Sequence, residues 1–160
     1  MVESSTRPKA GLTREVLQKA KDLIKPFEGL FLLPYKCPGG HDTVGWGHKI
    51  KPNEEALRKG ISPEQAETLL ERDITEAFQP LASIGGLNEN QLVASIDLVF
   101  NVGWRQVRES RFLKALREAD FSQAAKELVE FCHVNGEENK GLLRRRLKAQ
   151  GIFLLPPLSI

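Results

Sequence analysis

The stretch KPFEGLFLLPYKCPGGHDTVGWGHKI, residues 25–50, decides the fold, because a helical pattern ends in it and a strand-like pattern begins. It carries a carboxylic acid at Glu28, a thiol at Cys37 and a hydroxyl at Thr43. Glycines at 39, 40, 45 and 47 allow the positive φ values and close backbone approach that tight turns need. We therefore interpret this stretch as an active-site segment that the remainder of the chain supports.

The residues before Glu28 predict an amphipathic helix over 14–27. Thr13 is a suitable N-cap, and apolar residues then recur at helical spacing: Val16, Leu17, Ala20, Leu23, Ile24 and Phe27. Pro26 disfavours the α conformation of the residue before it and so strains the last turn. The helix is expected to end beside Glu28, which leaves that carboxyl at the end of an element.

The following residues predict a small sheet and then several helices. An alternation typical of strands runs through Phe31, Leu33 and Tyr35 and then through Val44, Trp46 and His48, with the PGGHD turn between them. Helices are predicted over residues 62–79, 91–102, 110–118, 120–131 and 142–150, and a loop over 133–141. The helix over 91–102 is apolar on most sides, which is typical of the buried centre of a bundle.

Together these elements predict one α+β domain over residues 13–160. A small antiparallel β lobe at about 29–55 would pack against a larger α-helical lobe formed by 13–28 and 56–160, with a ligand cleft between the lobes. Residues 1–12 are polar and are expected to form a flexible arm. The apolar tail FLLPPLSI, residues 153–160, is expected to pack across the helices.

The composition limits the partners and the compartment. A formal net charge of +2 is too small to indicate nucleic-acid binding and favours an anionic polymer only weakly. Two cysteines, Cys37 and Cys132, make no disulfide framework and fit a reducing compartment. No apolar run reaches the ~18 residues of a membrane span, and residues 1–12 contain no secretory signal. We expect a cytoplasmic protein without a transmembrane anchor or stable membrane association.

Glu28 has two interpretations from its surroundings alone. Phe27, Leu30 and Phe31 would desolvate a carboxyl at a helix end, and desolvation favours the protonated form that a general acid needs. The alternative is a solvated surface residue, because most glutamates are exposed.

The spacing of the segment favours the acid. Glu28, eight residues, Cys37, five residues and Thr43, flanked by Phe-Glu-Gly and Gly-Trp-Gly-His, resemble the catalytic signature of the phage-type lysozymes, the endolysin muramidases of glycoside hydrolase family 24. Two further blocks are similar to that family, LNENQLVASIDLVFNVGWRQVRES at 87–110 and GLLRRRLKAQGIF at 141–153. The resemblance covers about residues 14–153 and implies a lysozyme-like fold.

The resemblance also implies roles for individual residues. Glu28 would be the general acid that protonates the glycosidic oxygen between N-acetylmuramic acid and N-acetylglucosamine. Cys37 would take a second catalytic position that is more often an aspartate, and Thr43 would help to hold the attacking water. Gly47 and Asn101 would line the sugar cleft.

Cys37 departs from the two-carboxylate pattern of glycoside hydrolysis, so its role stays open. It is an activated base, an electrostatic partner, a water-positioning group or a small buried thiol. Asp42 is a substitute carboxylate or a cap of the turn. Cys37, His41 and His48 match no common zinc spacing, so we expect neither a metal nor another cofactor.

Two structural contacts are also implied by the resemblance. His48 would form an ion pair with Asp73 on the following helix. Arg144, Arg145 and Arg146 are consecutive, and consecutive side chains on a helix point about 100° apart, so they cannot form one basic patch. Arg145 is expected to face inward, and the other two arginines are expected to be solvated.

Three hypotheses of function follow. The leading one is an endolysin that hydrolyses bacterial peptidoglycan as a monomer, held in the host cytoplasm until a separate holin-type protein gives it access to the wall. A lytic transglycosylase needs no second carboxylate, but the retained Thr43 argues for a held water. A non-catalytic wall-binding module has no reason to keep an acid at Glu28.

Overall fold

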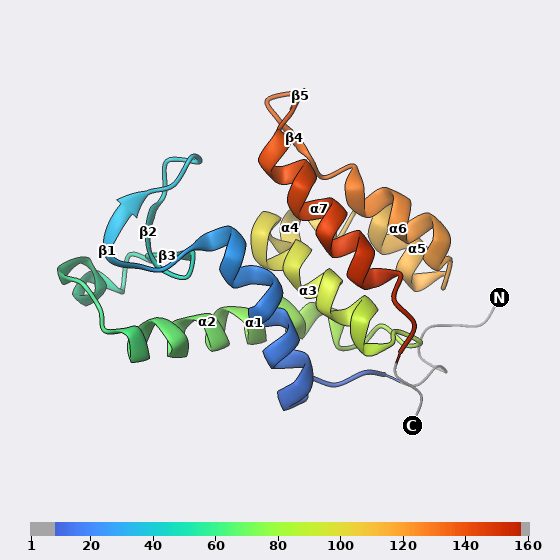
Figure 1. The fold of residues 1–160 in the computed structure, drawn as a ribbon, viewed down its shortest axis with the longest axis horizontal. Coiled ribbons are helices and arrows are strands. Elements are labelled where there is room, and N and C mark those ends of the chain that lie inside the picture. The colour runs from blue at the N-terminus through green and yellow to red at the C-terminus, as the bar shows by residue number, and fades with distance from the viewer. Residues whose placement is uncertain (1–8, 158–160) are drawn as a thin grey trace.

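The computed structural model describes residues 9–157 and places a small sheet at one end of an assembly of helices (Figure 1). This arrangement confirms the predicted α+β class. In chain order the elements, with η for 3-10 helices, are α1 (Arg14–Glu28), β1 (Phe31–Lys36), β2 (Asp42–Gly45), β3 (His48–Lys49), η2 (Glu55–Lys59), α2 (Pro63–Phe78), η3 (Gln79–Leu81), α3 (Glu89–Val102), α4 (Trp104–Val107), α5 (Arg111–Arg117), α6 (Phe121–Val129), β4 (His133–Val134), β5 (Glu137–Glu138) and α7 (Lys140–Phe153).

Helix α1 delivers Glu28 to the edge of the sheet. The Thr13 hydroxyl accepts a hydrogen bond from the Val16 amide, as the N-cap pattern predicts. Pro26 lies in the last turn, and the helix ends at Glu28, where Gly29 turns the chain with a φ of 72°. Because no further helical turn follows, the Glu28 side chain lies at a junction between α1 and β1.

The sheet has the order β1-β2-β3 with antiparallel pairing throughout. Tyr35 pairs with Thr43 and Phe31 pairs with Gly45, with a shift in register between these two pairs. Directly opposed residues of an antiparallel pair share a face of the sheet. Tyr35 and Thr43 therefore project from the same face.

Strand β1 differs from the predicted alternation between a buried and an exposed face. Leu30, Phe31, Leu32 and Leu33 are all exposed, with Leu33 at 69%. The strand lies at the edge of a three-stranded sheet, so neither of its faces is fully covered. Helix η2 packs beside β1, and the Ile61 amide donates to the Leu32 carbonyl at 2.9 Å, so the sheet end extends past the predicted limit at residue 55.

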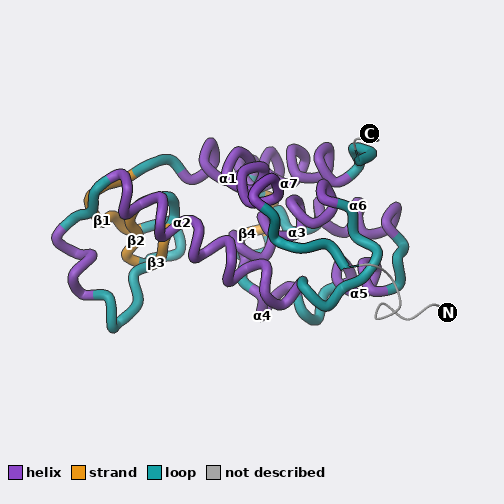
Figure 2. Tube along the Cα trace, turned by 90° about the horizontal axis from the view of Figure 1, so that it is seen from below, coloured by secondary structure: helices purple, strands orange, loops and turns teal. Residues whose placement is uncertain are grey.

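Helix α2 connects the sheet to the other helices (Figure 2). It begins with the predicted capping box of Ser62 and Gln65. Its first half packs under β2 in a small apolar cluster of Val44, Ile61, Ala66 and Leu69. Its second half contributes to a larger core around α3. The two apolar cores are therefore joined by one continuous helix.

Helix α3 is the buried centre of the helical part, as its composition predicts. Every residue from Gln91 to Val99 is buried. Helices α1, α2, α4 and α7 all pack against it. Its N-terminus carries a capping box of Asn88 and Gln91. Side chains of α3 consequently reach both the sheet end and the C-terminal helices.

Several predictions at the ends of the chain differ from the structure. Lys9 forms an isolated antiparallel bridge with Gly85, and Ala10 and Leu12 pack against the larger core, so residues 9–12 are anchored. The rest of the predicted arm, residues 1–8, lies outside the described residues. The predicted loop over 133–141 contains the β4–β5 hairpin, and α7 extends beyond the predicted 142–150 at both ends.

The predicted packing of the C-terminal tail is only partly correct. Phe153 is buried, and the Asn90 amide donates to the Leu155 carbonyl at 3.2 Å. The side chains of Leu154 and Leu155 are exposed at 59% and 54%. Residues 158–160 of this tail are not described. Within residues 9–157, no helix combines the length and apolar character needed to cross a bilayer.

Candidate active site

Glu28 is held against the turn between β2 and β3. A Cβ atom at Gly47 would lie 2.5 Å from Glu28 Oε1, and Gly47 has a φ of +78°. Both the close approach of Glu28 and the left-handed backbone therefore require glycine at this position. The Glu28 side chain is only 17% exposed. The sheet and α1 thus enclose one side of the carboxyl group.

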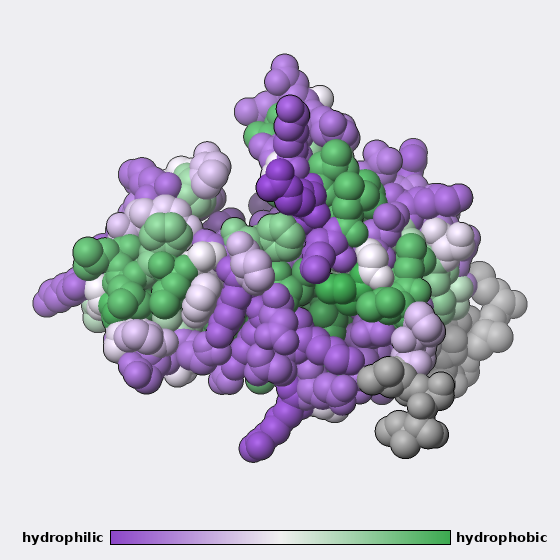
Figure 3. Space-filling view, viewed as in Figure 1, coloured by the Kyte–Doolittle hydropathy of each residue, from purple (hydrophilic) through white to green (hydrophobic). Residues whose placement is uncertain are grey.

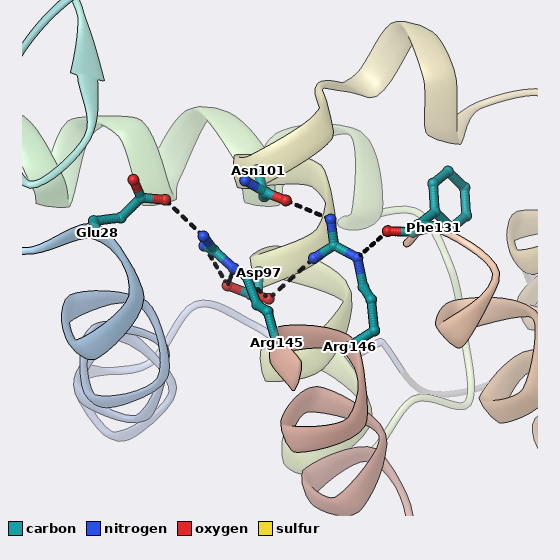
Figure 4. Close-up of polar contacts among 6 residues, drawn as sticks. All are labelled: Glu28, Asp97, Asn101, Phe131, Arg145 and Arg146. Atoms are coloured by element: carbon teal, nitrogen blue, oxygen red, sulfur yellow. Dashed lines mark hydrogen bonds and ion pairs between the residues drawn. The ribbon is translucent and has the colours of Figure 1, made fainter. Parts of the chain in front are cut away.

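Arg145 of α7 holds the other side of the Glu28 carboxyl group (Figure 4). Arg145 Nη1 donates to Glu28 Oε2 at 2.7 Å, and its Nη2 donates to Asp97 Oδ1 at 2.8 Å. The guanidinium also lies 5.4 Å from the centroid of the Phe27 ring. Burial lowers the pKa of Arg145, but the charges and hydrogen bonds of Asp97 and Glu28 outweigh burial and raise the pKa overall. Arg145 therefore faces inward and stays charged.

Arg146 is also buried, which corrects the prediction that it is solvated. It is 0% exposed, and its Nε donates to the Phe131 carbonyl at 2.8 Å. Helix α7 packs between α3 and α6, so two adjacent side chains of α7 both point into the protein. Burial lowers the pKa of Arg146 to about 10, with Asp97 acting in the opposite direction. Arg144 alone of the three arginines is exposed.

Asn101 lies on α3 one turn after Asp97, with its side chain joined to the same network. Its Oδ1 accepts a hydrogen bond from Arg146 Nη2 (Figure 4). The amide oxygen is therefore occupied by the protein, and the amide nitrogen is the group that remains for a ligand. The sequence predicts Asn101 at the sugar cleft, and that role stays a prediction.

Cys37 and Thr43 lie together on the face of the sheet that also carries Tyr35. The Cys37 amide donates to the His41 carbonyl at 2.9 Å, and the Thr43 hydroxyl donates to the same carbonyl at 3.0 Å. Burial raises the pKa of the Cys37 thiol, but hydrogen bonds with the His41 backbone, the Thr43 side chain and the Gly39 backbone outweigh burial, so the net shift is downward. The thiol is free and partly exposed. Its thiolate form is thus more accessible than that of an ordinary cysteine.

Asp42 does not face this thiol. Its carboxylate pairs with Lys36 at 2.9 Å and with Arg58 of η2. The hydrogen bond from Lys36, followed by the one from Arg58, lowers the pKa of Asp42 to about 2. Asp42 is therefore engaged in surface ion pairs, which disfavours it as a substitute for the second catalytic carboxylate.

A cleft of about 360 Å³ lies between the sheet end and the helices, as predicted. Gly47 and Lys49 line it from the sheet side, and Phe100, Asn101 and Trp104 line it from α3 and α4. The surface is hollowed between the sheet end and the projecting β4–β5 hairpin (Figure 3). Glu28 is not among the residues that line this cleft, but its carboxyl group lies against Gly47, which is one of them.

Residues 25–149 match the family described as phage lysozyme. The chain belongs to the phage lysozyme family. It is 35% identical over 144 residues to an endolysin of Acyrthosiphon pisum secondary endosymbiont phage 1, covering 86% of this chain and 97% of that relative. It is 33% identical over 149 residues to the endolysin of Bacillus phage PZA, covering 87% of this chain but only 55% of that longer relative.

A solved structure supports the same assignment. The muramidase domain of SpmX from Asticaccaulis excentricus has 25% sequence identity and a TM-score of 0.75, with 92% of this chain and 100% of that chain covered. Membership of the phage lysozyme family makes this chain a lysozyme-type glycoside hydrolase.

The lysozyme contains a second polar cluster around His48, and both His48 and Asp73 line the cleft. His48 Nδ1 lies 2.8 Å from Asp73 Oδ2, so the two predicted partners are in contact. His48 Nε2 lies 2.9 Å from Glu54 Oε1. Burial lowers the pKa of His48, but the hydrogen bonds and charges of Asp73 and Glu54 raise it overall. The stabilising effect of this cluster stays a prediction.

Three residues near the site were not identified as site residues from the sequence. Asp97 lies in an apolar helix, and a charged residue at such a position is itself a signal of a buried partner. Tyr35 shares a face with Thr43 through the strand register, which the sequence does not specify. Glu54 lies six residues after His48 in a polar connection, where no sequence pattern indicates that it contacts His48. Among residues 9–157 we find no cluster of three or more histidine, cysteine or acidic side chains suited to a metal ion.

Proposed function

We propose that this phage lysozyme is an endolysin that hydrolyses the β-1,4 bond between N-acetylmuramic acid and N-acetylglucosamine in bacterial peptidoglycan. The observation that carries the proposal is the fixed position of Glu28 between Arg145 and Gly47, and Gly47 lines the cleft between the sheet and the helices. A general acid needs such fixation, because proton transfer requires the acid within hydrogen-bond reach of the leaving oxygen.

The two oxygens of Glu28 have different surroundings, which suits proton donation. Oε2 accepts a hydrogen bond from Arg145, so the proton would be carried by Oε1 on the side of the β2–β3 turn. Glu28 transfers this proton to the glycosidic oxygen as the bond from that oxygen to C1 of muramic acid breaks. The positive charge that develops at C1 is then neutralised by attack of water.

Cys37 and Thr43 would hold and activate that water. They lie on one face of the sheet, and the pKa of Cys37 is lowered mainly through hydrogen bonds that outweigh its burial. A thiolate accepts a proton from water as its oxygen bonds to C1, while the Thr43 hydroxyl fixes the water by a hydrogen bond. The products are a glycan with a reducing muramic end and a glycan with a free 4-hydroxyl on glucosamine.

The proposal is tested by mass spectrometry of peptidoglycan fragments released by wild type and by Glu28→Gln. The wild type should release fragments with reducing muramic ends, and the variant should lose about 10²-fold or more of this activity, in keeping with the contribution of general acids. Anhydro-muramic ends would instead indicate a lytic transglycosylase. Binding of sacculi without fragments from either protein would support a wall-binding module.

For the cellular role, we propose a monomer that stays in the host cytoplasm until a separate holin-type protein opens a path to the wall. The relatives named as endolysins support a role in lysis. Expression of the chain with and without a holin-type protein tests it. Lysis should require both proteins, and lysis by the chain alone would contradict the proposed route.

A further inference from the structure

The buried carboxylate of Asp97 lies between the guanidinium groups of Arg145 and Arg146 (Figure 4). Asp97 Oδ1 accepts from Arg145 Nη2 at 2.8 Å and from its Nε at 3.1 Å. Asp97 Oδ2 lies 3.9 Å from Arg146 Nη1. Asp97 is 0% exposed, so water does not screen these charges as it would at a surface.

Asp97 also determines which donor of Arg145 is left for Glu28. The Nε and Nη2 groups of the guanidinium are taken by Asp97, and only Nη1 reaches Glu28. A guanidinium is a rigid planar fork, so fixing two of its nitrogens fixes the third. Asp97 therefore orients the hydrogen bond that Glu28 Oε2 accepts.

The charges around Glu28 do not balance without Asp97. Helix α7 contributes Arg145 and Arg146, and α3 contributes Asp97 as a single negative charge. From the sheet, β1 contributes Tyr35, whose pKa is raised first by burial and then by the charge of Glu28, so this phenol supplies no negative charge at neutral pH. A protonated Glu28 thus already leaves two buried cations against one anion.

Arg146 shows that this cluster is short of negative charge. Its Nη1 has no hydrogen-bond partner within the described part of the chain. Burial and the nearby charge of Arg145 lower its pKa, Asp97 opposes them, and the net result is a pKa of about 10. Among residues 9–157, the ion pairs of these two guanidinium groups are with Asp97 and Glu28, so removal of Asp97 would leave Glu28 as their remaining carboxylate partner.

We propose that Asp97 is a positioning residue that keeps Glu28 able to hold its proton, by fixing Arg145 and by supplying the negative charge that the two arginines otherwise draw from Glu28. This inference rests on the proposed function, because it assigns a supporting group to the proposed general acid. Asp97 does not touch the substrate and acts through Arg145.

The test compares turnover against pH for wild type, Asp97→Asn, Arg146→Met and the double variant, on soluble glycan fragments of peptidoglycan. Asp97→Asn keeps the side-chain shape but removes its charge. Glu28 should then lose its proton at lower pH. The alkaline limb of the profile of kcat against pH should therefore move to lower pH. At neutral pH kcat should fall about tenfold or more while KM changes little, because general acids contribute about 10²- to 10⁴-fold.

The other two variants give results that a purely structural role would not produce. Arg146→Met removes a cation, so the alkaline limb should move to higher pH, opposite to the shift in Asp97→Asn. The double variant restores the charge count, and its limb should return toward that of wild type. If each substitution only damaged the structure, the reductions of kcat in the two single variants would multiply in the double variant.

A matched control is Lys21→Met, which removes another buried cation, about two helical turns before Glu28 on α1. Lys21 is 7% exposed and pairs with Glu67 and Glu71 between α1 and α2. This variant should lower the melting temperature without moving the alkaline limb.

An unchanged limb in folded Asp97→Asn, or a double variant whose losses multiply, would overturn the inference. Where Asp97→Asn does not fold, an unchanged limb in Arg146→Met overturns it equally. Absence of turnover by wild type would instead overturn the proposed function, and this inference with it.

Discussion

At the scale of single residues, the proposed catalytic groups depend on the residues that contact them. Glu28 lies against a glycine that has no side chain, and Cys37 lies among backbone amides that favour its thiolate. The reactive groups are thus adjusted by contacts from other parts of the chain. Two predictions follow at this scale, one for each group.

Gly47→Ala should lower turnover at least about tenfold, because the new methyl group would displace the Glu28 carboxyl from its position and misplaced groups lose catalytic efficiency steeply. Gly40→Ala is the matched control. Gly40 has a φ of +81°, close to the +78° of Gly47, but no atom lies within 4 Å of a Cβ there. Both variants should lose about 1–2 kcal/mol of stability from the positive φ. Equal turnover of the two variants would show that the Gly47–Glu28 contact is unimportant.

Cys37 should react with iodoacetamide at a lower pH than an ordinary thiol. Hydrogen bonds to its sulfur outweigh burial and lower its pKa, whereas burial and nearby acidic groups raise the pKa of Cys132. Mass spectrometry of the two peptides over a pH series measures both alkylation rates in one sample. Cys37→Asp should retain turnover and Cys37→Ala should lose it. An alkylation rate that is highest at Cys132 would contradict this account.

At the scale of elements, His48 links β3 to the segment before η2 and to α2. It is 2% exposed and lies between Glu54 and Asp73. Its pKa in the folded protein is raised above the value in the unfolded chain, because the two carboxylates outweigh burial. The contribution of His48 to stability is therefore complete below the unfolded pKa and is lost as pH rises through the folded pKa.

Thermal unfolding over a pH series should show this contribution. The melting temperature of wild type should fall as pH rises above the ordinary titration range of histidine. Asp73→Asn should lower the stability by about 3 kcal/mol, as expected for breaking a buried pair, and should flatten this fall. Turnover should change far less than stability. A variant with wild-type stability and no turnover would contradict a structural role for the pair.

The elements also show what the sequence can and cannot predict. Thr13, Ser62 and Asn88 cap helices through contacts three residues apart, and all three helix starts were predictable from local pattern. The burial of Arg146 was not predictable, because it depends on α7 packing between α3 and α6. Asp97 and Arg145 are 48 residues apart in the chain, and a single sequence does not indicate which distant residues form a pair.

At the scale of the whole molecule, two apolar cores share helix α2. The small core under the sheet contains Val44, Ile61, Ala66 and Leu69, and the larger core surrounds α3. The sheet end contributes Gly47 and Thr43 to the site, and the helical part contributes Arg145 and Asp97. The sequence predicted the α+β class and the cleft. It did not predict that β1 is an exposed edge strand, because that depends on which elements cover the sheet.

Val44→Ala should loosen the sheet end more than the helical part. Val44 is 0% exposed, and removal of buried methyl groups should cost about 1–3 kcal/mol. Hydrogen exchange followed by mass spectrometry should show faster exchange in residues 31–49 and nearly unchanged exchange in residues 111–129. Equal acceleration in both regions would show that the two cores unfold as one unit.

The central claim, hydrolysis by water with Glu28 as the acid, is tested most directly by digestion of peptidoglycan in water enriched in oxygen-18. Each muramic acid that wild type releases should carry one heavy oxygen at its reducing end, and Glu28→Gln should release almost no product. Release of fragments with anhydro ends and no heavy oxygen, or full activity of Glu28→Gln, would contradict it.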